Sequence, residues 1–237
     1  MKIVLIGHGK MGRLIEETAR DAGDSVVGIF TDDNLADLAT FEAADVVIDF
    51  SNHVALPAVV DYVKRTGTAL LSGTTGYSEE EKTLLFSAGD AAPVLWSANF
   101  SLGIAVLAKA LRLVTGALRP DFDIEVTETH HNKKADAPSG TAKLLIDALD
   151  PTHELMPVYG REGFTGARTG NEIGVHALRG GTVAGTHTVH YFGPDEELEF
   201  THRASSRQIF VNGALKAARL LVKEPKGVTT LDALLFR

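Results

Sequence analysis

The stretch Lys2–Gly12, KIVLIGHGKMG, decides the fold of this 237-residue chain. Its first half is a short apolar run of the kind that forms a buried strand. Its second half matches the pattern G-x-G-x-x-G at Gly7, Gly9 and Gly12. The residues that follow, Met11–Ala22, have the periodicity of an amphipathic helix. A glycine turn between a strand and a helix is typical of the first unit of a parallel α/β sheet.

The glycine turn also predicts a binding site. Gly7 permits the tight turn, Gly9 lets the backbone approach a pyrophosphate, and Gly12 lets helix and strand pack closely. The free N–H groups at the start of the helix suit phosphate oxygens. A glycine turn without a ligand is the alternative. We expect dinucleotide binding by the loop residues Gly7, His8, Gly9, Lys10, Met11 and Gly12.

An acidic residue stands where a dinucleotide site needs one. Asp32 lies 20 residues past Gly12, just beyond the apolar run Ser25–Phe30. A carboxylate there can accept hydrogen bonds from the adenosine ribose. The sequence around it, Thr-Asp-Asp-Asn, is also an ordinary turn composition, so Asp32 has a purely structural alternative.

The residues up to position 100 alternate between short apolar runs and amphipathic segments. This order is typical of right-handed βαβ units and a parallel sheet. The apolar strands agree, because a parallel sheet is covered on both faces. Strands are expected at 2–6, 25–30, 44–50, 69–72 and 93–97, and helices at 11–22, 55–65 and 78–88.

Two further loops follow strands of this sheet and should emerge at its carboxyl edge, where such sheets bind ligands. The first is GTTG at 73–76, and the second is SANF at 97–100. Each could also be an ordinary loop. We expect Gly73, Thr74, Thr75, Ser97, Ala98, Asn99 and Phe100 to contribute to the nucleotide site.

The rest of the chain has a different character. A long apolar helix is expected at 101–118, an alternating strand at 123–128 and a helix at 142–149. The segment 157–181 is rich in glycine and arginine, and we expect it to be irregular. Two antiparallel strands should follow at 182–192 and 197–203, and a last helix at 208–222 should return to the first domain.

The expected fold class is therefore α/β with two domains. Residues 1–100 plus 208–237 form a Rossmann dinucleotide-binding domain. Residues 101–207 form a smaller domain of mixed α and β structure, which binds the substrate.

Composition limits the partners. The formal net charge of −8 makes a nucleic-acid or anionic-membrane surface unexpected. There is no cysteine, so disulfides and thiolate metal sites are excluded, which fits a cytoplasmic protein. No apolar run is long enough to span a bilayer.

The segment 128–142, ETHHNKKADAPSGTA, concentrates titratable groups in an otherwise acidic chain. His130 and His131 leave the end of a strand and can exchange protons near neutral pH. Lys134 adds a positive charge. Ser139 is a candidate helix cap, so the first-turn N–H groups at Gly140 and Thr141 are suited to a carboxylate. The segment predicts a pocket for a small anion beside a proton donor.

Two other interpretations of this segment were weighed. It could be a solvated basic loop. Alternatively, His130, His131, His187 and His190 could bind a metal, but adjacent histidines in an extended chain point to opposite sides and no common metal motif is present. We therefore expect no metal.

Segment 128–142 closely resembles the signature of the 4-hydroxy-tetrahydrodipicolinate reductase family, also called dihydrodipicolinate reductase. The resemblance extends over essentially the whole chain and includes the glycine loop, GTTG at 73–76, SANFSLG at 97–103 and HRASSR at 202–207. It implies reduction of 4-hydroxy-tetrahydrodipicolinate by NADH or NADPH, with loss of water, in lysine and diaminopimelate biosynthesis.

The resemblance also implies roles for particular residues. His130 matches the proton donor of the family and Lys134 its second catalytic residue. His131, Gly140 and Thr141 match positions that bind the dicarboxylate substrate. The family assembles as a homotetramer through its second domain, which is thus expected to serve in oligomerisation as well.

The chain departs from the family in its glycine loop, which is one residue shorter than the common G-x-x-G-x-x-G. Asp33 also stands where a basic residue often follows the acidic one. These departures leave the preference between NADH and NADPH open. Two other functions were considered: another two-domain NAD(P)-dependent reductase, and a nucleotide-sensing binding protein without catalysis.

Overall fold

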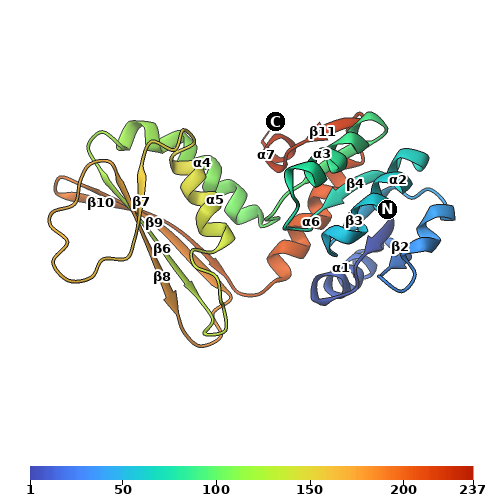
Figure 1. Ribbon diagram of the computed structural model, residues 1–237, viewed down its shortest axis with the longest axis horizontal. Helices are drawn as coiled ribbons and strands as arrows, with labels where there is room; N and C mark the ends of the chain where they lie inside the picture. Colours follow the sequence, from blue (N-terminus) through green and yellow to red (C-terminus); the bar gives the residue numbers. More distant parts are fainter. Residues whose placement is uncertain (237) are drawn as a thin grey trace. The chain divides into compact units, whose positions relative to one another are not determined.

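The computed structural model describes residues 1–236, which form two compact units (Figure 1). Unit 1 comprises residues 1–101 and 208–236, and unit 2 comprises Leu102–Arg207. The chain therefore leaves the first unit, builds the second and returns. None of the helices within residues 1–236 is long and apolar enough to cross a membrane.

Unit 1 contains a six-stranded parallel sheet in the order β11-β5-β4-β3-β1-β2. This is the Rossmann-like arrangement expected from the glycine turn and the alternating segments. The strands are β1 (Lys2–Ile6), β2 (Ser25–Phe30), β3 (Val46–Asp49), β4 (Ala69–Ser72), β5 (Pro93–Trp96) and β11 (Gly227–Thr229). The helices are α1 (Lys10–Asp21), α2 (Leu56–Thr66), α3 (Glu79–Ser87), α6 (Gln208–Leu221) and α7 (Leu231–Leu235), with short 3-10 turns at 35–40, 53–55 and 88–90.

The sheet of unit 1 is covered on both faces, which explains its apolar strands. Val4, Val47 and Leu70 of the sheet belong to one buried cluster with Val59 and Val63 of α2. Helix α6 contacts β3, β4, β5 and α1. Helix α6 therefore completes the first unit although it comes late in the sequence, and β11 adds an edge strand that the sequence did not predict.

Parallel strands place all their carboxyl ends at one edge. The loops after β1, β3, β4 and β5 therefore emerge together, and they carry residues 7–9, 50–52, 73–76 and 97–99. This edge is where open α/β sheets bind ligands.

Unit 2 contains a five-stranded mixed sheet in the order β10-β9-β6-β8-β7. Strand β9 runs antiparallel to β10 and β6, whereas β6, β8 and β7 run parallel to one another. The elements are α4 (Leu102–Leu118), β6 (Asp123–His130), α5 (Gly140–Leu149), β7 (Met156–Tyr159), β8 (Glu172–Arg179), β9 (Gly185–Gly193) and β10 (Glu196–Ala204).

One face of this sheet forms the core of unit 2. Alternate residues of β6 are buried, as its pattern predicted, and Val126 packs in a cluster with Leu111 of α4, Leu145 of α5 and Tyr191 of β9. Helices α4 and α5 therefore cover this face of the sheet (Figure 1).

The expectation that 157–181 is irregular was wrong. Strand β7 overlaps its start, and β8 fills most of its second half. Periodicity missed them because β7 is a short edge strand that is mostly exposed, while β8 has a buried run of only three residues before its exposed end. The side chain of Arg168 anchors the intervening loop by donating to the carbonyls of Ile124 and Glu172. Strand β6 also continues to His130, two residues further than expected.

Candidate active site

Unit 1 has a pocket of about 330 Å³ at the carboxyl edge of its sheet. Four of the predicted nucleotide-site residues line it: Gly7, His8, Gly9 and Asp32. Phe50, Ser51 and Asn52, which sequence reasoning did not single out, line it as well. They follow a buried strand directly and lie at the same carboxyl edge of the sheet, and this position could have identified them from the sequence.

The three glycines of the turn have different roles. Gly7 has a φ of +87°, a conformation that favours glycine. A Cβ on Gly12 would collide with the carbonyl oxygen of Gly7. A Cβ on Gly9 would meet nothing within 4 Å, so the space beside it is open to a ligand. Gly7 and Gly12 thus shape the turn, and the open space beside Gly9 is compatible with a cofactor that carries phosphate groups.

The other predicted nucleotide residues do not line this pocket. Lys10, Met11 and Gly12 form the first turn of α1. Thr74 is buried, and its carbonyl accepts a hydrogen bond of 2.8 Å from Trp96 Nε1. Ser97 Oγ donates to the carbonyl of Asn99. The side chain of Phe100 is 1% exposed and packs on Phe50, so it belongs to the core. Gly73, Thr75 and Ala98 lie in the same two loops.

A buried carboxylate holds these loops in place. Asp49 at the end of β3 is 2% exposed. One of its oxygens accepts from Ser51, and the other accepts from the hydroxyls of Ser72 (2.9 Å) and Tyr77 (3.1 Å). Burial raises the pKa of Asp49, although these hydrogen bonds oppose the rise. The network joins the loops after β3 and β4. Its only signal in the sequence was an aspartate at the end of an apolar strand.

Replacing Gly9 by valine should weaken NADH binding by at least about tenfold and leave the melting temperature nearly unchanged. The added side chain enters open space in which a pyrophosphate would lie, so it affects the ligand and not the packing. Gly12→Val is the matched control, because its side chain collides with backbone and should lower the melting temperature. Fluorescence titration with NADH and thermal unfolding measure the two effects. Unchanged NADH affinity in Gly9→Val would contradict the assignment of this turn.

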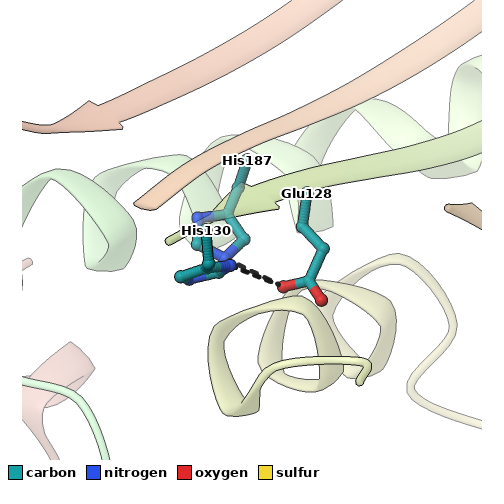
Figure 2. Close-up of side chains that lie close together, drawn as sticks. All are labelled: Glu128, His130 and His187. Carbon is teal, nitrogen blue, oxygen red and sulfur yellow. Dashed lines mark ion pairs between the residues drawn. The ribbon is translucent and has the colours of Figure 1, made fainter. Parts of the chain in front are cut away.

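Unit 2 gathers Glu128, His130 and His187 at one end of its sheet (Figure 2). Glu128 and His130 are two apart on β6 and so face the same side of the strand. His187 lies on the neighbouring strand β9, directly opposite Glu128 in the register. Glu128 Oε2 is 3.3 Å from His130 Nδ1 and 3.7 Å from His187 Nε2.

The second oxygen of Glu128 faces the loop that precedes α5. Oε1 accepts the backbone N–H of Ser139 at 3.0 Å and Nη2 of Arg179 at 3.2 Å. Burial alone would raise the pKa of Glu128, but these hydrogen bonds outweigh it and hold the pKa below its usual range. Glu128 is therefore a buried anion, paired on one side with the guanidinium of Arg179.

Ser139 caps α5, as its position predicted. Its Oγ accepts the N–H of Ala142 at 3.1 Å and lies 3.1 Å from His187 Nε2. Gly140, the first residue of α5, is exposed, and a Cβ there would meet nothing within 4 Å. Gly140 and Thr141 thus begin a helix whose N-terminal end has open space beside it, which suits a carboxylate.

His130 and His187 are both buried and both favour the neutral form. Burial lowers the pKa of His130; the charge of Glu128 opposes the fall, while Lys134, Arg179 and His131 add to it. Burial and the neighbouring His130 lower the pKa of His187 to about 4. At neutral pH the free protein therefore holds His187 uncharged, and an added anion beside His130 would raise the pKa of His130.

Lys134 lies in the turn after β6, and its N–H donates to the carbonyl of His131. Its Nζ is 2.7 Å from Asp136 Oδ1. Because Asp136 is largely exposed, this ion pair is weak and readily exchanged for another carboxylate. The structure therefore places the predicted residues His130, His131, Lys134, Gly140 and Thr141 along one strand end, one turn and one helix start.

The arrangement bears on the metal alternative. One potential ligand atom from each of Glu128, His130 and His187 lies within 4.8 Å of the others. His190, a member of the four-histidine set that was considered, instead pairs with Glu199 at 2.9 Å. Arg179 already supplies a positive charge to Glu128. A larger cavity of about 770 Å³ along β8 includes neither His130 nor Lys134 among its lining residues.

Comparison with known proteins identifies the family. A family described as "Dihydrodipicolinate reductase, N-terminus" matches residues 1–100, and "Dihydrodipicolinate reductase, C-terminus" matches residues 103–235. A 4-hydroxy-tetrahydrodipicolinate reductase of a species of Exiguobacterium is 40% identical over 99% of this chain and 95% of the relative. The protein of that name from Staphylococcus aureus is 41% identical over 99% of this chain and 100% of the relative.

Solved structures share the fold. A dihydrodipicolinate reductase from Paenisporosarcina sp. TG-14, bound to dipicolinate, is similar with a TM-score of 0.79 at 21% identity, over 99% of both chains. An amine dehydrogenase from Mycobacterium smegmatis is similar with a TM-score of 0.57 at 12% identity, over 100% of this chain and 97% of the other. With both halves matched and relatives near 40% identity, the chain belongs to the 4-hydroxy-tetrahydrodipicolinate reductase family of NAD(P)H-dependent oxidoreductases.

Proposed function

We propose that this chain performs its family's reaction with His130 as the proton donor and Lys134 as the cation that binds and neutralises the substrate. The reaction converts 4-hydroxy-tetrahydrodipicolinate, NAD(P)H and a proton into tetrahydrodipicolinate, NAD(P)⁺ and water. The observation that supports these roles best is the juxtaposition of a buried histidine, a lysine and a helix start along residues 130–141.

The substrate carries two carboxylates, and the proposed site has groups for them. The N–H groups of Gly140 and Thr141 at the start of α5 are suited to one carboxylate, and His131 is proposed to contribute to substrate binding as well. Lys134 suits the other, because it can exchange its exposed partner Asp136 for a substrate carboxylate. A lysine at this position also stabilises the negative charge that develops on the ring during reduction.

The charges of the bound substrate also explain how His130 gains its proton. In the free protein its pKa is lowered, chiefly by burial. A bound dianion adds negative charge close to the imidazole and raises that pKa, so the proton is taken up as substrate binds. The imidazolium then gives its proton to the ring as electron density builds there. Substrate binding thus favours the charged form of His130, which can then give its proton to the substrate.

The cofactor is NADH or NADPH, which supplies a hydride when it is bound. We propose that the glycine turn holds its pyrophosphate, with Gly9 leaving the space, and that Asp32 accepts from the adenosine ribose. The remaining loop residues at 10–12, 73–75 and 97–100 would border the cofactor. Unit 1 is thus the dinucleotide-binding domain and unit 2 the substrate domain.

We further propose that the chain is a cytoplasmic homotetramer without nucleic-acid or membrane partners. Tyr159 and Leu178 of unit 2 are more than half exposed, and both line the cavity along β8. Such apolar surface favours coverage by a second copy. Light scattering should give four times the mass of the chain, and Leu178→Asp should lower it, whereas the exposed Val54→Asp in unit 1 should not. A monomeric wild type would contradict the proposal.

The reaction itself is tested by following oxidation of NADH while the preceding synthase generates the substrate. Oxidation that depends on the synthase product is expected. Another two-domain reductase would instead oxidise NADH with a different substrate, and a nucleotide sensor would bind NADH without turnover.

A further inference from the structure

Glu128 faces two parts of the site at once. Its side chain is fully buried, Oε1 contacts Ser139 and Arg179, and Oε2 lies 3.3 Å from His130 Nδ1. Oε2 and His130 Nδ1 have no hydrogen-bond partner among the described residues. Their contact is therefore electrostatic and not a well-aligned hydrogen bond. A buried carboxylate is costly unless its neighbours compensate it, so its presence here calls for an explanation.

We propose that Glu128 is a positioning residue, whose carboxylate holds the proton-donating imidazole of His130 and the Ser139 N–H before α5 in one fixed arrangement. This inference rests on the function proposed above. It deepens that function by linking the proton donor on β6 to the helix start that is suited to the substrate carboxylate. The sequence pattern alone predicted no role for Glu128.

The arrangement selects one nitrogen of His130 for the reaction. Nδ1 faces Glu128. Nε2 faces the start of β9, where a Cβ on Gly185 would lie 3.1 Å from it. Glycine at 185 thus keeps a side chain away from Nε2, and a proton held at Nδ1 by the carboxylate leaves Nε2 as the atom that exchanges its proton with substrate.

Charges from all neighbouring elements act on His130. On β6 and the following turn these are Glu128, His131 and Lys134, with Asp136 paired to the lysine; on β8 it is Arg179, and on β9 it is His187. Only Glu128 among the groups that act directly on His130 favours the imidazolium, while burial, Lys134, Arg179 and His131 oppose it. Glu128 therefore opposes the fall in the pKa of His130 that burial and the neighbouring cations cause.

The test is the titration of His130 in the intact protein. Histidine labelled with ¹³C at Cε1 gives one NMR signal per histidine, and His130→Gln identifies the signal of His130. Glu128→Gln keeps an oxygen for the Ser139 N–H but removes the charge. It should lower the pKa of His130 by about one unit, and the fall of kcat/KM at high pH should move to lower pH by the same amount.

The direction of the pKa shift of His130 distinguishes this positioning role from a general loosening of the site. A loosened site would admit water and raise the pKa of His130, so an unchanged or raised value in Glu128→Gln overturns the inference. Glu199→Gln is the matched control, because it removes a Glu–His contact of 2.9 Å in the same sheet and should not move His130. Should Glu128→Gln fail to fold, Arg179→Gln removes an opposing cation and should raise the pKa; no rise would overturn the inference.

This titration does not depend on turnover. If the proposed reaction were wrong, NADH oxidation would be absent while the shift in the pKa of His130 remained. If only the role of Glu128 were wrong, turnover would persist and the pKa of His130 would not fall.

Discussion

Replacing His130 by glutamine is expected to lower kcat by ~10²-fold or more, the usual effect of removing a positioned acid. Lys134→Ala should have an effect of similar size, because it removes the cation that stabilises charge on the reacting ring. NADH affinity should barely change in either variant, since both residues lie in unit 2 and the nucleotide pocket lies in unit 1. Synthase-coupled oxidation of NADH and direct NADH titration measure the two quantities.

Lys133→Ala is the matched control for Lys134. It removes a neighbouring charge of the same kind from an exposed position and should keep nearly normal turnover. Thermal unfolding of all three variants shows whether the fold is intact. Near-normal turnover in both His130→Gln and Lys134→Ala would exclude this segment as the active site.

The second large effect concerns the cofactor. Asp32 lines the nucleotide pocket, and Asp33 follows it. A 2′-phosphate near these carboxylates would be repelled by on the order of 1–3 kcal/mol, whereas a 2′-hydroxyl can donate to Asp32. Lys10 and Arg13 flank the turn and offer opposing positive charge, although Arg13 already donates to the carbonyl of His8. We expect dual use, with kcat/KM for NADH equal to or above that for NADPH.

Replacing Asp32 by alanine together with Asp33 by arginine should shift the ratio of kcat/KM towards NADPH by at least ~tenfold, about 1.4 kcal/mol. The change removes the repulsion and adds a cation for the phosphate. Asp37→Ala, an exposed acid in the following 3-10 turn, is the control and should leave the ratio unchanged. A strong NADPH preference in the wild type, or an unmoved ratio in the double variant, would show that these acids do not set the preference.

The first unit was largely predictable because its determinants are local. A strand, a glycine turn and a helix follow one another in residues 2–21, and parallel strands place their loops at one edge whatever the details of packing. The second unit was less predictable, because its strands pair across long separations. Strand β8 pairs with β6, which lies far before it in the sequence. The glycine-rich segment that precedes β8 has no periodic pattern, so periodicity did not reveal the strand.

The candidate site likewise has a part that could be predicted from the sequence and a part that could not. Residues 130–141 are consecutive and rich in titratable groups, so the sequence alone singled out His130 and Lys134 as candidates. Its prediction of a helix cap at Ser139 is confirmed. The sequence did not predict which residues of other strands lie beside this segment. Arg179 and His187 come from other strands, and only the register of the sheet brings them beside Glu128. Glu128 itself has a weak signal, since it lies two residues before His130 and so shares its face of the strand.

Proton uptake on ligand binding is the decisive measurement, because the proposed site binds a dianion and protonates His130 in one event. Pyridine-2,6-dicarboxylate, a planar analogue of the substrate, can be titrated calorimetrically in buffers of different ionisation enthalpy with NADH present. We expect tight binding with net uptake of protons near neutral pH, and loss of that uptake in His130→Gln while binding persists. Binding without proton uptake in the wild type, or uptake that is equal in His130→Gln, would contradict it.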